Sequence, residues 1–247
     1  MAQVRNAVAT ETIPIVALDF PSADAALAMV DRLGDACGFY KVGNELFTAA
    51  GPEIVRRLVA RGLDVFLDLK FHDIPNTVAG GVRSAARLGA RLVTVHAAGG
   101  RAMLDAAVGA AAGEGGACAI LAVTVLTSLD GAALATAWGR ESVDVSAEVL
   151  RLAGDAADAG AHGIVCSGHE LAAVRARFGE RLAPLVPGVR RAADAVGDQA
   201  RVITPRGAAA AGARYVVVGR PVTAAADPVV AMREIAAELA FAAGAPC

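Results

Sequence analysis

Residues 63–77 read LDVFLDLKFHDIPNT, an apolar run that passes into a short charged segment. The run over residues 63–67 has the length and composition of a buried strand, and Pro75 marks the point where the chain must turn out of it. Side chains two positions apart on a strand point the same way, so Asp68 and Lys70 are expected to project together from the strand's end. Such a cluster of charges is costly to bury without a purpose. It is therefore a candidate site, with a surface turn held by ion pairs as the alternative.

Eight short apolar runs occur along the chain, and each is followed by an amphipathic stretch. This alternation predicts parallel strands joined by helical crossovers, and eight such units can close into a single (β/α)8 TIM barrel. An open doubly wound sheet is the alternative, but no G-x-G-x-x-G follows the first run. We expect one barrel domain over residues 1–247, with the barrel proper over about 13–240. The apolar runs are 13–19, 39–43, 63–67, 91–96, 119–126, 163–167, 182–186 and 215–220.

Polar residues stand at the carboxyl ends of nearly all eight runs. In a TIM barrel these ends share one face, and the active site lies there. Gly219 and Arg220 end the last run, at a position where barrels of this kind commonly bind phosphate. The glycine offers an unshielded backbone N–H, and the arginine guanidinium can donate two parallel hydrogen bonds. For Arg220, pairing with a helix end is the alternative. The residues at the eight ends are Asp19, Lys41, Asp68, Lys70, His96, Thr127, Ser167, Arg190 and Arg220.

The segment DLKFHDIPNT (68–77) resembles, nearly letter for letter, the signature of the orotidine 5′-phosphate decarboxylase family. The similarity runs from about Ile13 to the last helical stretch, with no departure at the positions that carry the family's chemistry. We expect the free-standing form of the family rather than the form fused to a phosphoribosyltransferase domain, because the sequence shows no such domain before the barrel. Six further segments are similar in the same order: ALD (17–19), KVG (41–43), LTS (126–128), PGVR (187–190), DQARVITP (198–205) and VVGRPVT (217–223).

The resemblance implies decarboxylation of orotidine 5′-phosphate to uridine 5′-monophosphate, the last step of de novo pyrimidine nucleotide synthesis. Lys70 would protonate C6, and the resemblance further implies a homodimer in which Asp73 and Thr77 enter the partner's site. The catalytic residues so implied are Lys70, Asp68, Asp73 and Lys41. The implied substrate-binding residues are Asp19, Lys41, Thr77, Thr127, Ser128, Arg190, Gln199, Gly219 and Arg220.

No cofactor and no metal are expected. Loss of carbon dioxide from C6 leaves an electron pair in the plane of the ring, where a cofactor acting as an electron sink does not fit the geometry. The four cysteines show no C-x-x-C spacing, and reduced, mostly buried thiols are expected. The site must instead stabilise charge where it develops, and a fixed ammonium does so.

The composition argues against large polyanionic partners. The net charge is -2, which provides no field to gather nucleic acid or an anionic membrane. The most apolar stretch, residues 117–126, is too short to span a bilayer, and the N-terminal residues lack the apolar core of a secretory signal. A cytoplasmic protein without a nucleic-acid or membrane partner is expected.

Two other functions remain open from the sequence. A related barrel decarboxylates 3-keto-gulonate 6-phosphate with magnesium and shares D-x-K-x-x-D, although the Asp73-Ile74-Pro75 continuation and the block at 198–199 argue against it. A catalytically silent barrel that binds nucleotide phosphates is the other alternative. The intact set of Lys41, Asp68, Lys70 and Asp73 argues against that.

Overall fold

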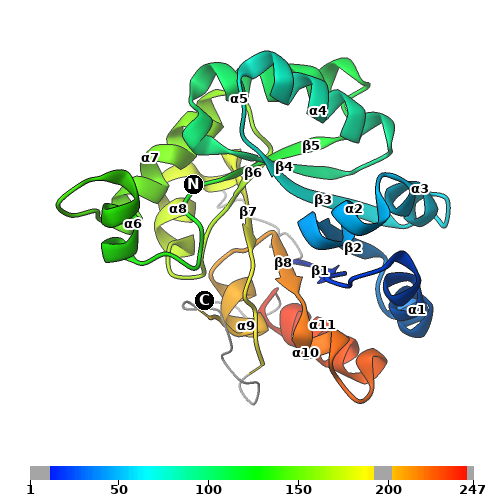
Figure 1. Ribbon diagram of the computed structural model, residues 1–247. Helices are drawn as coiled ribbons and strands as arrows, with labels where there is room; N and C mark the ends of the chain where they lie inside the picture. Colours follow the sequence, from blue (N-terminus) through cyan, green and yellow to red (C-terminus); the bar gives the residue numbers. More distant parts are fainter. Residues whose placement is uncertain (1–11, 192–201, 244–247) are drawn as a thin grey trace, which may run out of the picture.

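Eight parallel strands close into a barrel, which confirms the predicted fold (Figure 1). The computed structural model describes residues 12–191 and 202–243 of the chain. The first strand pairs on one side with the second, Val16 opposite Tyr40, and on the other side with the eighth, Ile13 opposite Tyr215. The strands are β1 (Ile13–Ala17), β2 (Phe39–Gly43), β3 (Asp64–Phe71), β4 (Leu92–His96), β5 (Ala119–Val123), β6 (Gly163–Val165), β7 (Ala183–Val186) and β8 (Tyr215–Val218).

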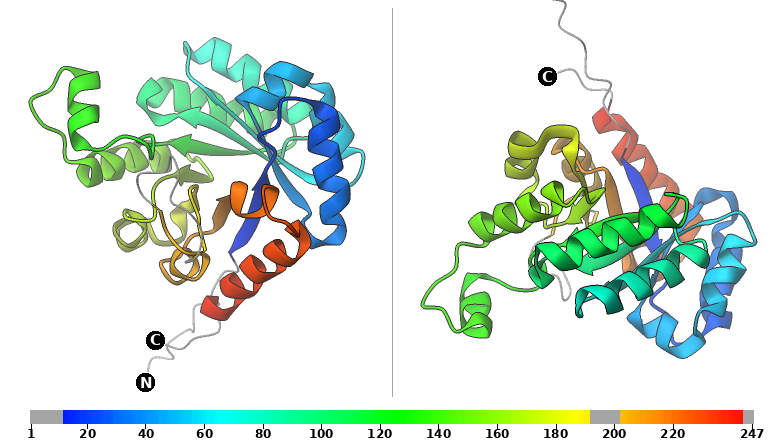
Figure 2. Two further views of the ribbon diagram at one scale, coloured as in Figure 1. Left: turned by 60° about the horizontal axis from the view of Figure 1, so that its bottom comes forward. Right: turned by 90° about the horizontal axis from the view of Figure 1, so that it is seen from above.

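Helices form the outer ring of the barrel. In Figures 1 and 2, α4 and α5 lie side by side, α11 packs along α9 and α1, and α6 stands away from the barrel. Within the described residues, no helix has both the length and the apolar character that a membrane crossing requires. The α-helices are α1 (Ala23–Leu33), α2 (Asn44–Ala50), α3 (Glu53–Val59), α4 (Pro75–Arg87), α5 (Arg101–Gly113), α6 (Gly131–Trp138), α7 (Val145–Asp158), α8 (Leu171–Phe178), α9 (Pro205–Ala210), α10 (Arg220–Thr223) and α11 (Pro228–Ala243). Short 3₁₀ turns are η1 (Gly34–Ala36), η2 (Ala97–Gly99) and η3 (Gly179–Arg181).

Side-chain caps fix where several helices begin. The N–H of Ala25 donates to Ser22 Oγ at 3.3 Å, so Ser22 caps α1. Asp130 and Asp144 cap α6 and α7 in the same way. The long connection after β5 therefore contains two helices, α6 and α7.

The core has an inner and an outer layer because successive strand residues point to opposite faces. On β1, Ile15 and Ala17 pack inside the barrel, whereas Val16 and Leu18 pack against the surrounding helices. All four are almost fully buried. Inward residues near the carboxyl ends of the strands, such as Phe66, also form the floor of the pocket described below.

Three cysteines lie buried in the outer layer of the core as thiols that form no disulfide among the described residues: Cys37, Cys118 and Cys166. Burial raises the pKa of the Cys37 thiol and raises that of Cys118 to about 11. These two thiols are therefore protonated near neutral pH and behave as small apolar groups. Cys247 lies outside the described residues.

Candidate active site

A cavity of about 430 Å³ opens at the carboxyl ends of the strands, on the face that the barrel fold predicts. The floor of the cavity is apolar, and its rim carries charge of both signs. The floor residues include Ala17, Phe66, Val123, Val165, Leu185 and Val217. The charged residues that line it are Asp19, Lys41, Asp68, Lys70, Arg190 and Arg220.

Four of these charged side chains form a chain of alternating sign. Lys41 Nζ lies 2.9 Å from Asp19 Oδ1 and 3.9 Å from Asp68 Oδ2. Lys70 Nζ donates to both carboxylate oxygens of Asp68, each at 2.9 Å. Alternating charges at these distances stabilise one another in a partly buried site. The prediction that Asp68 and Lys70 project together is confirmed.

The backbone that brings Asp68 and Lys70 together is not a regular strand. β3 extends to Phe71, past the expected end at residue 67, and its pairing with β4 shifts register between Leu67 and Phe71. Lys70 has a φ of 52°, and it is the one non-glycine residue with positive φ in the described part of the chain. Such a conformation costs a bulky residue on the order of 1–3 kcal/mol, so the surrounding contacts must hold it.

Thr94 on β4 makes those contacts, and the sequence reasoning gave it no role. Its Oγ1 accepts a hydrogen bond from the backbone N–H of Lys70 and donates one to Asp68 Oδ1, both at 2.9 Å. Thr94 is fully buried. The signal in the sequence is a polar residue inside the otherwise apolar run of β4.

Gly43, at the end of β2, leaves room for the Lys41 ammonium. A Cβ at this position would lie 2.7 Å from Lys41 Nζ and 3.3 Å from Asp19 Oδ1. In the sequence, Gly43 stands out only as the last residue of the similar segment KVG (41–43). Its steric role depends on the position of Lys41 in three dimensions, which the sequence does not display.

The rim at the ends of β7 and β8 carries positive charge. Gly219 and Arg220 line the cavity at the end of β8, and Thr223 on α10 lines it beside them. Arg190 lines it from the segment after β7 and is 9% exposed. Two guanidinium groups at one end of a cavity suit a phosphate or another dianion.

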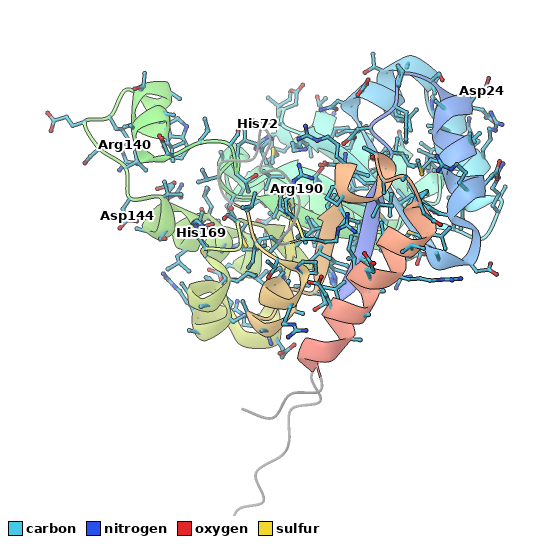
Figure 3. The ribbon with its side chains drawn as sticks, turned by 90° about the horizontal axis from the view of Figure 1, so that it is seen from below. Asp24, His72, Arg140, Asp144, His169 and Arg190 are labelled. Carbon is cyan, nitrogen blue, oxygen red and sulfur yellow. The ribbon has the colours of Figure 1, made fainter. Side chains whose placement is uncertain are left out.

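The neighbouring arginines Arg190 and Arg191 point to different surroundings. The Arg190 backbone is fixed by a hydrogen bond from its N–H to Ile203 O at 3.0 Å, and Figure 3 places its side chain near the centre of the molecule. Arg191 pairs instead with Glu234 on α11, with Nη1 2.8 Å from Oε2. Arg190 is therefore the one of the two that lines the cavity.

Three predicted site residues do not line the cavity in the described part of this single chain: Asp73, Thr77 and Ser128. Asp73 is exposed and its Oδ1 accepts the N–H of Ile74 at 2.7 Å, while Thr77 is exposed at the start of α4. Thr127 does line the cavity. Gln199 lies outside the described residues.

Two of the strand-end residues, Ser167 and His96, are not among the described residues that line the cavity. Ser167 Oγ accepts the N–H of His169 at 3.2 Å, close to the start of α8. The ring of His96 packs against that of His72, with 5.3 Å between centroids. Burial lowers the pKa of His96, and the electrostatic influence of the nearby His72 and Lys70 lowers it further. His96 is therefore a neutral neighbour of Lys70 near pH 7.

The fold and this arrangement of charges define a class: a (β/α)8-barrel enzyme with a cluster of lysines and aspartates and two arginines at the carboxyl ends of its strands. The family model described as orotidine 5′-phosphate decarboxylase / HUMPS matches residues 12–235. The chain belongs to this family.

Individual relatives are similar to this chain over nearly its full length. The orotidine 5′-phosphate decarboxylase of Halorhodospira halophila is 53% identical over 232 residues, covering 92% of this chain and 96% of the relative. That of Anaeromyxobacter sp. is 56% identical over 223 residues, covering 90% and 96%. The crystal structure of orotidine 5′-phosphate decarboxylase from Lactobacillus acidophilus superposes with a TM-score of 0.83 at 36% identity, covering 93% of this chain and 99% of that one.

Proposed function

We propose that this protein decarboxylates orotidine 5′-phosphate to uridine 5′-monophosphate. The observation that carries the proposal is the Lys70 ammonium, held by Asp68 at 2.9 Å and facing a cavity whose other rim bears Arg190 and Arg220. One end of such a cavity suits a phosphate, and the other suits a charged reacting centre. The identity of about 50% to decarboxylases over nine-tenths of the chain supports the same substrate.

In the proposed mechanism Lys70 stabilises the developing charge and then protonates it. The bond between C6 and the carboxylate carbon breaks, carbon dioxide leaves, and the electron pair stays on C6 in the plane of the ring. An ammonium close to C6 stabilises that pair electrostatically and transfers its proton to C6. The resulting Lys70 amine regains a proton from solvent after the product leaves. Asp68, which is paired with Lys70, would also crowd the substrate carboxylate and favour its departure.

The proposed substrate contacts follow the family resemblance, and most of the residues concerned line the cavity. Lys41 and Asp19 orient Lys70 and the ribose hydroxyls, and Thr127 with Ser128 contacts the pyrimidine. The phosphate is held by Gly219 and Arg220, with Arg190 and Gln199 joining them. Binding energy from the phosphate, remote from C6, is then available to exclude water from the reacting centre.

We further propose that the working unit is a cytoplasmic homodimer without a nucleic-acid or membrane partner. Asp73 and Thr77 would complete the site of the partner subunit. Their exposure in the single chain supports this arrangement, as does the 67% exposure of the neighbouring Ile74. A large exposed apolar side chain beside two polar site residues suits an interface.

The test is to mix the purified protein with orotidine 5′-phosphate, with and without a chelator, and to follow loss of the orotate absorbance. We expect conversion to uridine 5′-monophosphate at the same rate in both samples. Conversion that the chelator abolishes would favour the magnesium-dependent relative, which keto-sugar phosphates would then test. Binding of the nucleotide without any conversion by the folded protein would favour a silent binding barrel.

A further inference from the structure

We propose that Thr94 is a positioning residue that sets the geometry of Asp68 and Lys70 for proton transfer. The inference rests on the proposed role of Lys70 as the proton donor. The Thr94 hydroxyl joins the backbone of Lys70 to the carboxylate of Asp68 through two hydrogen bonds of 2.9 Å. One small group therefore fixes both partners of the reacting ion pair.

The irregular pairing of β3 and β4 explains why a side chain is needed here. Between the paired positions Leu67–Val93 and Phe71–Val95, β3 advances by four residues while β4 advances by two. The extra length forms a bulge that contains Lys70, and it leaves the Lys70 N–H to a side-chain acceptor. Bulges of this kind re-aim side chains next to active sites.

A threonine meets the chemical requirement of this position. Its hydroxyl can accept from an N–H and donate to a carboxylate at the same time, and its branched Cβ restricts the side chain to few rotamers on a strand. Thr94 is fully buried, so water does not replace these bonds when the hydroxyl is removed. Valine has the same shape without the hydroxyl. In the Thr94→Val chain, the Lys70 N–H and one lone pair of Asp68 lose their partner.

A purely structural role is the competing explanation, and a matched residue separates the two. Thr124 is also a buried threonine beside the barrel strands, 4% exposed, and its hydroxyl donates to the Val165 carbonyl at 2.8 Å. Thr124 is not among the described residues that line the cavity. Thr124→Val therefore removes a buried hydrogen bond near the site without touching Asp68 or Lys70.

The experiment compares wild type, Thr94→Val, Thr94→Ser and Thr124→Val. For each, the single-turnover rate constant and KM for orotidine 5′-phosphate are measured together with the midpoint of urea unfolding. We expect Thr94→Val to lower the rate constant by roughly 10- to 100-fold, because displacement of a reacting group by a fraction of an ångström has effects of this size. Its KM should change little, since the phosphate contacts are intact. Thr94→Ser should recover most of the rate.

Thr124→Val should lose a similar amount of stability while its rate stays within about twofold of wild type, because its hydrogen bond fixes no reacting group. A wild-type rate in Thr94→Val would overturn the positioning role, as would an equal loss of rate in both valine variants. If Thr94→Val does not fold, Thr94→Ala removes the same hydroxyl with a smaller side chain. The same loss of rate is then expected of Thr94→Ala, and a wild-type rate would overturn the positioning role. A wild-type protein without turnover would reject the proposed function itself, whereas normal wild-type turnover with an unaffected Thr94→Val rejects only the role of Thr94.

Discussion

Replacing Gly43 by alanine should reduce activity while leaving the fold intact. The added Cβ would lie 2.7 Å from Lys41 Nζ, whereas ordinary contacts of a Cβ begin at 3.4 Å. The Lys41 ammonium must therefore withdraw by several tenths of an ångström. Since it lies between Asp19 and Asp68, the whole chain of charges shifts with it.

The structure separates the catalytic effect from the effect on stability. Gly43 has φ -97° and ψ -175°, which alanine adopts without strain. The substitution should stabilise the fold by about 0.4–1 kcal/mol, because alanine lowers the conformational entropy of the unfolded chain. Weakening the Lys41–Asp19 pair offsets this by up to about 1 kcal/mol, because Asp19 is exposed and such pairs contribute little. The net change in the free energy of unfolding is therefore expected within about 1 kcal/mol of zero.

The effect on activity should be far larger. Misplacement of a reacting array by a fraction of an ångström lowers kcat by roughly 10- to 100-fold. The assay measures kcat and KM from the loss of orotate absorbance, and urea unfolding measures stability. Gly38→Ala is the matched control, since it lies just before the same strand at the other end of the barrel and its Cβ would have no heavy atom within 4 Å. A wild-type kcat in Gly43→Ala, or an equal loss in Gly38→Ala, would refute the steric role of Gly43.

Three further predictions test other parts of the site. Arg220→Ala should raise KM by about 10- to 100-fold, because it removes a charge-assisted contact that contributes about 1.5–3 kcal/mol. An unchanged KM would count against phosphate binding by Arg220. Mixed dimers of inactive Lys70→Ala and Asp73→Ala chains should recover activity if Asp73 acts in the partner's site; heterodimers without activity would place both residues in one site. The fold holds the pKa of His96 below its ordinary 6.5, so the unfolded chain binds the proton more readily, and the free energy of unfolding should fall as pH drops below that value. His96→Asn should show a smaller fall in urea unfolding, and an equal fall in both proteins would contradict the role of His96.

The barrel was predictable because strands buried on both faces read as continuous apolar runs. Residues 119–123 are an example, since Leu121 and Val123 pack inside the barrel while Ile120 and Ala122 pack outside it, and no polar residue interrupts them. The charges at the strand ends were predictable for a related reason. Charged residues make up only 19% of this chain, so their repeated occurrence directly after apolar runs is not expected by chance. The carboxyl ends of parallel barrel strands share one face, and the charges are therefore expected to meet there.

The fine geometry of the site was not predictable from local patterns. The positive φ of Lys70 depends on a register shift between two strands, and the sequence of β3 alone contains no sign of it. The role of Thr94 depends on the same long-range pairing. Ser167 shows that a polar residue at a strand end need not belong to the cavity. Its hydroxyl instead accepts a hydrogen bond from the backbone N–H of His169, near the start of α8.

The most direct test of Lys70 as the proton donor is the single-turnover rate of Lys70→Ala with orotidine 5′-phosphate, measured beside wild type in the presence of a chelator. The Lys70 side chain is 32% exposed at the rim of the cavity, so its removal should leave the fold and the unfolding midpoint nearly unchanged. We expect wild type to form uridine 5′-monophosphate and the folded Lys70→Ala chain to form none above background. Formation of product by Lys70→Ala at a rate close to that of wild type would show that another group protonates C6.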